Sequence, residues 1–148
     1  MAKKSAKKKK PSALKKFFLA ALAYAILAQI LHSIGAFLTM SYYTDPAYFG
    51  LWSSLMMPTN GPPGVEFFAV SLIFSFVIGL IFAYLYHRLK GTVSGITFGL
   101  LLFAVSCVPG YLSTYLLLAV PTLLLVSWAV EGLVVSILGG LAIASLMK

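Results

Sequence analysis

Charged side chains are scarce in this sequence of 148 residues, since Asp, Glu, Lys and Arg together make up only 9% of it. A soluble domain carries about a quarter of such residues, whereas here the hydrophobic share reaches 61%. So few charges cannot cover the surface of a soluble globule. The composition therefore excludes an ordinary soluble enzyme, a disordered protein and a nucleic-acid-binding domain.

Residues that make disulfides or bind metals are also few, with one cysteine, two histidines and three acidic residues in the chain. A single cysteine excludes an internal disulfide framework and a Cys-rich metal site. Two histidines and three acids supply too few ligands for a convincing zinc site. The sequence also has no metalloprotease helix motif, no Gly-rich phosphate loop and no Gly-x-Ser-x-Gly elbow. These absences argue against an enzyme, and the sequence identifies no cofactor.

Long apolar runs are what the sequence does contain, and there are four of them. They cover residues 17–40, 65–86, 92–119 and 121–147. About 20 apolar residues are enough for a helix to cross the hydrocarbon layer, and the runs lack the alternation typical of a membrane β-barrel. The sequence therefore predicts an all-α fold, a four-helix transmembrane bundle in one domain (17–148), after a polybasic tail (1–16).

The third run contains Pro109, which removes a backbone donor and clashes with the carbonyl one turn earlier. One interpretation is a kinked helix that continues to Ala119, about 40 Å long at 1.5 Å per residue. The other is a helix that ends at Val108, with the following segment along the outer surface. We favour the kinked helix.

Basic residues indicate the orientation in the membrane. Eight of the eleven lie in the first sixteen positions, and the other three are Arg88, Lys90 and Lys148. With four spans all of them fall on one side, which the positive-inside rule identifies as the cytoplasm. Both termini are therefore expected to be cytoplasmic. A cleaved signal peptide, with cleavage before Ala36, is the alternative, but the apolar run is longer than a usual signal sequence.

The lysine-rich tail cannot fold alone, and beside a membrane it is attracted to anionic lipid. A topology anchor is its simplest role, and an acidic partner protein or RNA is the alternative. No aromatic residue lies among the lysines of this tail. Base stacking, and with it nucleic-acid binding, is therefore not indicated.

The loop at 41–64, expected on the outer side, is too long for a simple turn. Asp45-Pro46 has the form of a helix N-cap followed by proline at the first helical position. Phe49, Trp52 and Leu55 or Met56 then recur at helical spacing, which predicts a short amphipathic helix in the membrane interface. A loop that lies along the membrane without helical structure is the equally weighted alternative.

Small residues recur every fourth position in the last two spans. They are Gly91, Gly95 and Gly99 in the third and Gly132, Ser136 and Gly140 in the fourth. Such spacing lets helix backbones approach closely in lipid. Packing within the bundle is the first interpretation. The alternatives are a homo-oligomer or docking onto another membrane protein.

Glu131 is the most informative residue because it lies about 15 Å inside the fourth span at 1.5 Å per residue. An ionisable group at such a depth usually faces the bundle interior and is a functional candidate. His32 and Gln29, one turn apart, reach the same level in the first span. Further members of this predicted polar layer are Ser75, Ser106 and Trp128.

Three roles are open for this polar layer. It can hold helices together by hydrogen bonds, bind the head of a lipid or quinone, or relay protons between Glu131 and His32, which are both titratable. Our first interpretation of the chain is a non-enzymatic accessory or assembly subunit that acts through helix packing. The alternative is binding of a lipid- or quinone-like ligand, or proton-coupled transport, through the layer around Glu131.

Several short motifs run through most of the chain after the tail. They are His32, Tyr42-Tyr43 before Asp45-Pro46, Met56-Met57, the Gly91/Gly95/Gly99 repeat, Trp128-x2-Glu131-Gly132 and Gly139-Gly140. In these features the chain resembles the small four-span integral membrane proteins of bacteria and archaea that have no assigned function. The resemblance implies a four-span fold in the cytoplasmic membrane of a prokaryote, and it brings no catalytic residues.

Overall fold

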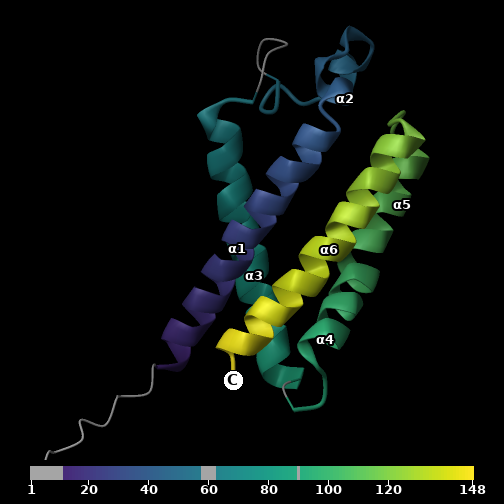
Figure 1. The fold of residues 1–148 in the computed structure, drawn as a ribbon. Helices are drawn as coiled ribbons and strands as arrows, with labels where there is room; N and C mark the ends of the chain where they lie inside the picture. The colour runs from purple at the N-terminus through teal and green to yellow at the C-terminus, as the bar shows by residue number, and fades with distance from the viewer. Residues whose placement is uncertain (1–11, 58–62, 90) are drawn as a thin grey trace, which may run out of the picture.

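The computed structural model describes residues 12–57, 63–89 and 91–148. This part of the chain is helical and contains no strand (Figure 1). Four helices are long and apolar enough to cross a membrane: α1 (Ala13–Leu38), α3 (Val65–Leu89), the continuous segment Gly95–Leu117, and α6 (Thr122–Leu146). The prediction of an all-helical fold with four helices long and apolar enough to cross a membrane is confirmed. Most of the predicted tail and the turn around Asn60 lie outside the described residues.

The helix ends follow local capping rather than the edges of the apolar runs. Helix α1 begins four residues before Phe17, because the Ser12 hydroxyl accepts a hydrogen bond from the Lys15 amide (3.4 Å). Helix α4 (Gly95–Leu102) begins later than Thr92, because the Ser94 hydroxyl caps it by accepting from the Thr97 amide (3.1 Å). The helices therefore extend beyond the apolar runs, or stop short of them, by a few residues.

The third membrane-spanning segment is continuous through Pro109. Helix α4 passes through a π-helical turn, η2 (Phe103–Cys107), into α5 (Val108–Leu117). The amide of Val108 bonds to the carbonyl of Phe103, five residues earlier. This wider turn makes room for the proline ring, which would clash with the carbonyl four residues back in a regular α-helix. The third segment therefore does not end at Val108.

Two short helices lie between α1 and α3. Helix α2 covers Ser41–Thr44, and a 3₁₀-helix, η1, covers Pro46–Leu51. Asp45 caps η1, since its carboxylate accepts from the Ala47 amide (2.9 Å) and Pro46 occupies the first helical position. The helix ends at Leu51, so the helical spacing that links Phe49 to Met56 is not realised as one longer helix.

Both ends of the described chain lie at the same end of the bundle, as Figure 1 shows. There the Lys16 ammonium group donates a hydrogen bond to the backbone carbonyl of Lys148. We call this end, with the α3–α4 turn, the terminal end, and the opposite end, with α2 and η1, the loop end. Gly91 lies in the α3–α4 turn with φ of +89°, a conformation that favours glycine.

We call the half of the bundle next to the terminal end the terminal half and the half next to the loop end the loop half. Close helix packing is concentrated in the terminal half. Helix α1 packs along both α3 and α6, and α4 packs along α6. The buried residues of α1 all precede Gln29, and those of α3 all follow Phe74. No residue of α5 is buried. In Figure 1, α1 and α3 diverge toward the loop end, where the interior is more open.

Candidate functional site: a polar cavity in the loop half

A cavity of about 910 Å³ occupies the loop half of the bundle. Helices α1, α3, α5 and α6 and the segment between α1 and α3 all contribute to its wall. The wall residues are Gln29, His32, Ser33, Ala36, Phe37, Met40, Tyr43, Thr44, Phe49, Met56, Met57, Pro63, Phe67, Phe68, Ser71, Tyr111, Trp128 and Glu131. A volume of this size is typical of sites that bind small molecules.

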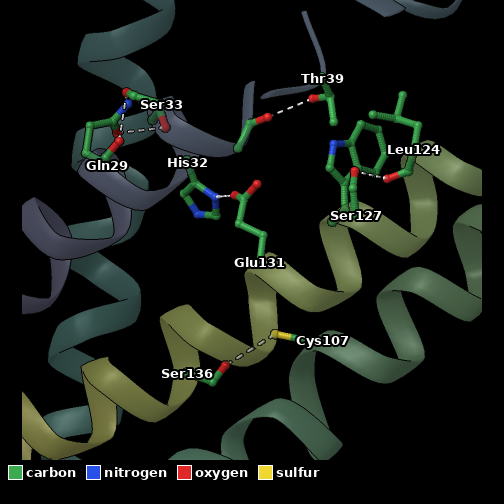
Figure 2. A network of polar contacts seen from close by, with 12 residues as sticks. Gln29, His32, Ser33, Thr39, Cys107, Leu124, Ser127, Glu131 and Ser136 are labelled. Carbon is green, nitrogen blue, oxygen red and sulfur yellow. Dashed lines mark hydrogen bonds and ion pairs between the residues drawn. The ribbon is translucent and has the colours of Figure 1, made fainter. Parts of the chain in front are cut away.

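The central polar contact joins α1 to α6. His32 Nδ1 lies within hydrogen-bonding distance of Glu131 Oε1, and Figure 2 shows the two side chains facing each other between these helices. The Glu131 side chain is 16% exposed and that of His32 is 47% exposed. The carboxylate is therefore largely enclosed, whereas about half of the imidazole surface is exposed.

Gly35 creates the space in which this carboxylate lies. A methyl group at position 35 would overlap with the carboxyl group of Glu131. A residue with a side chain there would force the acid away from α1. Gly35 is thus part of the site, although no spacing pattern in the sequence singles it out.

A second polar pair joins α1 to α3. The Ser71 hydroxyl donates to the side-chain oxygen of Gln29 (3.1 Å). On α1 itself the Ser33 hydroxyl donates to the backbone carbonyl of Gln29 (2.8 Å). Ser71 lies one turn from Ser75, the serine expected from matched depth. Ser75 is buried on α3 but does not line the cavity.

An aromatic cluster closes the site toward the loop end. Trp128 donates its indole N–H to the Tyr43 hydroxyl (3.2 Å), which ties α6 to the segment after α1. Trp52 packs between them, with ring centroids 4.8 Å from Tyr43 and 6.3 Å from Trp128. The indole nitrogen of Trp52 is buried and has no hydrogen-bond partner in the described part of the chain.

Tyr111 and Gly132 meet on the α5–α6 side of the cavity. A methyl group at Gly132 would overlap with the Tyr111 hydroxyl. Gly132 therefore leaves room for the Tyr111 side chain, whereas Gly140, nearer the terminal end of α6, lets two helix backbones approach. Tyr111 follows the π-helical turn, so its position in the wall could not be derived from regular helical spacing.

Ser106 and Cys107 do not line the cavity, and Figure 2 shows Cys107 next to Ser136 of α6, away from the Glu131–His32 contact. The Ser106 hydroxyl donates to the Leu102 carbonyl of its own helix (2.6 Å). The Cys107 sulfur is 3.7 Å from the Ser136 hydroxyl. Of the predicted polar layer, the structure thus brings Gln29, His32, Trp128 and Glu131 together, and leaves Ser75 and Ser106 outside the cavity.

The small residues of α4 and α6 form a separate contact. A methyl group at Gly140 would lie 2.7 Å from the Gly99 amide nitrogen and 2.8 Å from its Cα. One at Gly99 would lie 2.7 Å from the Cα of Ile137, next to Ser136, and one at Gly95 would lie 2.9 Å from Ala144. Gly91, in the turn, has open space around it and does not belong to this contact.

No family model, curated protein or solved structure matches this chain. Among the described residues, no group of three histidine, cysteine or acidic side chains could hold a metal ion. The chemistry of the site therefore depends on the cavity itself. It offers one carboxylate, one imidazole, an amide–hydroxyl pair and an apolar, aromatic wall.

Proposed function

We propose that this protein binds an amphipathic, membrane-soluble ligand of the lipid or quinone type in the loop-half cavity. The observation that carries the proposal is the enclosure of polar groups from three helices within a largely apolar wall. Ligand sites commonly combine an apolar lining with a few polar groups that orient the ligand. Glu131 with His32, and Gln29 with Ser71, are the groups that would receive the polar head.

The depth of these groups supports a ligand with an apolar body. Glu131 lies near the middle of α6, and an ionisable side chain in a membrane span generally faces an interior or a water-filled cavity. Phe67, Phe68 and Met40 would line the path of an apolar chain toward the loop end. A ligand with a polar head and an apolar body would satisfy both parts of the wall.

An accessory subunit that acts through helix packing remains the alternative role. It would need a small-residue face that is free to meet a partner. The faces of α4 and α6 that carry Gly95, Gly99 and Gly140 pack on each other within this chain. This internal use favours ligand binding over the alternative.

A cavity-filling variant tests the proposal. Ala36 lines the cavity, so Ala36→Phe would occupy part of it, whereas Ala69→Phe makes the same change at an exposed site on α3 outside the cavity wall. Each protein is purified in mild detergent, and its bound lipids and quinones are extracted and identified by mass spectrometry. We expect a species bound to the wild type and to Ala69→Phe, and lost from Ala36→Phe. The same extract from all three proteins would contradict the proposal.

We also propose that the terminal end faces the cytoplasm. Lys15, Lys16, Arg88 and Lys148 lie at this end, and the acids Asp45 and Glu66 lie toward the other. The tail lysines would then meet anionic lipid, with about 1 kcal/mol of attraction for each charge near the surface.

Single cysteines at positions 4, 148 and 54, introduced into a Cys107→Ala background, test this orientation with an impermeant thiol reagent on intact cells. We expect labelling at position 54 alone. Labelling at position 148 without labelling at 54 would reverse the orientation.

A further inference from the structure

We propose that the ligand selected by the loop-half cavity is a hydrophobic organic cation, such as an amine or quaternary ammonium or phosphonium ion with an apolar body. This inference rests on the proposed function and narrows it from amphipathic ligands in general to one charge class. Three features of the wall support it.

The first feature is the charge of the wall. Among the described residues that line the cavity, Glu131 is the only acidic one, and none is Lys or Arg. An anionic head such as a phosphate or a carboxylate would meet no permanent cation there. Since moving an unpaired charge out of water is costly, the wall disfavours anions.

The second feature is the number of aromatic rings in the wall of the same cavity. Seven of the wall residues are aromatic: Phe37, Tyr43, Phe49, Phe67, Phe68, Tyr111 and Trp128. The face of an aromatic ring attracts a cation, and the attraction grows when the pair is shielded from water. A cavity that combines a carboxylate with many rings suits a cation better than a neutral head of the same size.

The third feature is the partner of the acid. Glu131 contacts the imidazole of His32, and in the described part of the chain no arginine or lysine forms an ion pair with it. The imidazole is about half exposed, so it can yield its place beside the carboxylate to an incoming cation. A carboxylate in the membrane that lacks a fixed counter-ion gains most from a ligand that supplies one.

Two probes of nearly the same shape and opposite charge test the inference. Tetraphenylphosphonium is the cation, tetraphenylborate is the anion, and a short-chain ubiquinone analogue serves as a neutral probe. Binding is measured by equilibrium dialysis against the full chain in phosphatidylcholine nanodiscs, with empty nanodiscs subtracted. We expect saturable binding of the cation and none of the anion.

Glu131→Gln should weaken cation binding by at least about tenfold, as expected for loss of a shielded charge partner. Glu66→Gln is the matched control, because it removes an acid of α3 that lies outside the cavity wall. Glu131→Asp keeps the charge and should retain measurable binding. Thermal unfolding of each variant in the same nanodiscs shows whether it is folded, and a folded Glu131→Gln with unchanged cation binding would overturn the inference.

The probes separate this inference from the proposed function. Saturable binding of the neutral probe alone, abolished by Ala36→Phe, would overturn the charge preference and leave the ligand site standing. Equal binding of the cation and the anion would also overturn the preference. Failure of all three probes, together with extracts that Ala36→Phe leaves unchanged, would contradict both.

Discussion

The terminal half and the loop half of this bundle solve different packing problems. In the terminal half, glycines and alanines let backbones touch, as where Gly79 of α3 meets the Ala21 backbone of α1. In the loop half, the same helices carry larger and more polar side chains, and a cavity of about 910 Å³ opens between them. Lipid provides no hydrophobic force between helices, so close contacts of small residues hold such a bundle together. One half therefore supplies the stability that lets the other half stay open.

The largest expected effect comes from disrupting the helix packing of the terminal half. Gly140→Leu would place side-chain atoms against Gly95 and Gly99 and separate α6 from α4. Inserting bulk into a packed contact costs about 1–3 kcal/mol and sometimes more, and this site has backbone on the opposite side, so we expect the upper end. Thermal unfolding in detergent measures it. Leu138→Ile, at a residue that is 40% exposed, should be nearly silent, and equal tolerance of both changes would contradict the packing.

The next effect falls on the loop half. Gly35→Ala places a methyl group where the Glu131 carboxylate lies, so the contact with His32 should break. The carboxyl group ends a flexible side chain and can move aside, so relative to Gly110→Ala we expect a loss of about 1 kcal/mol in unfolding free energy, the net value of one hydrogen bond. Gly110→Ala makes the same change in α5, where nothing lies within 4 Å, and should be neutral or slightly stabilising because alanine favours helix. Thermal unfolding that ranks the two variants alike would argue against this placement of Glu131.

Two substitutions of Glu131 distinguish the contribution of its hydrogen bond to stability from that of its charge. Glu131→Gln keeps the shape and the capacity to bond to His32, so it should leave the unfolding temperature close to that of the wild type. Glu131→Leu removes the partner of a polar side chain, which costs about 1–3 kcal/mol when the group is fully buried. His32 is partly exposed, so we expect the lower end of this range. Stability that is insensitive to both changes would show that the contact does not hold α1 to α6.

The smallest effect concerns the two tryptophans of the aromatic cluster at the loop end. Trp128→Phe loses the hydrogen bond to Tyr43 (3.2 Å), and a hydrogen bond contributes about 0.5–1.5 kcal/mol net. Trp52→Phe makes the same change at an indole whose nitrogen has no partner in the described chain, so only ring contacts are lost. Chemical denaturation of both variants should rank Trp128→Phe as the less stable. The reverse order would contradict the bond.

The sequence predicts the four helices because their apolar runs are long and continuous, and it brings Glu131 and His32 to one level because depth in a membrane helix follows from counting residues. It does not predict which serine of α3 reaches the cavity. Depth selects Ser75, but the diverging axes of α1 and α3 bring Ser71 to Gln29 instead. Gly35 also escapes prediction, because its role depends on where a side chain of another helix comes to lie.

Tyr111 shows a further limit of reasoning from spacing. Small-residue repeats predict close backbones, and in α4 and α6 the glycines do meet backbone atoms. At Gly132 the same signal instead marks the place of the Tyr111 hydroxyl. A repeat of small residues indicates free space beside a helix, and the partner that fills the space is decided by the tertiary arrangement.

The π-helical turn η2 is equivalent to the insertion of one extra residue into an α-helix. Each residue of an α-helix turns the chain by about 100°, so everything after Cys107 is rotated by that angle relative to a helix without the extra residue. The rotation sets which face of α5 carries Tyr111 toward α6. Val105 is an exposed position in the turn. Deleting this one residue would rotate α5 by about 100° about its axis and carry Tyr111 out of the wall, although no residue of the cavity would have been changed. The composition of this site therefore depends on the length of a segment that contributes no residue to its wall.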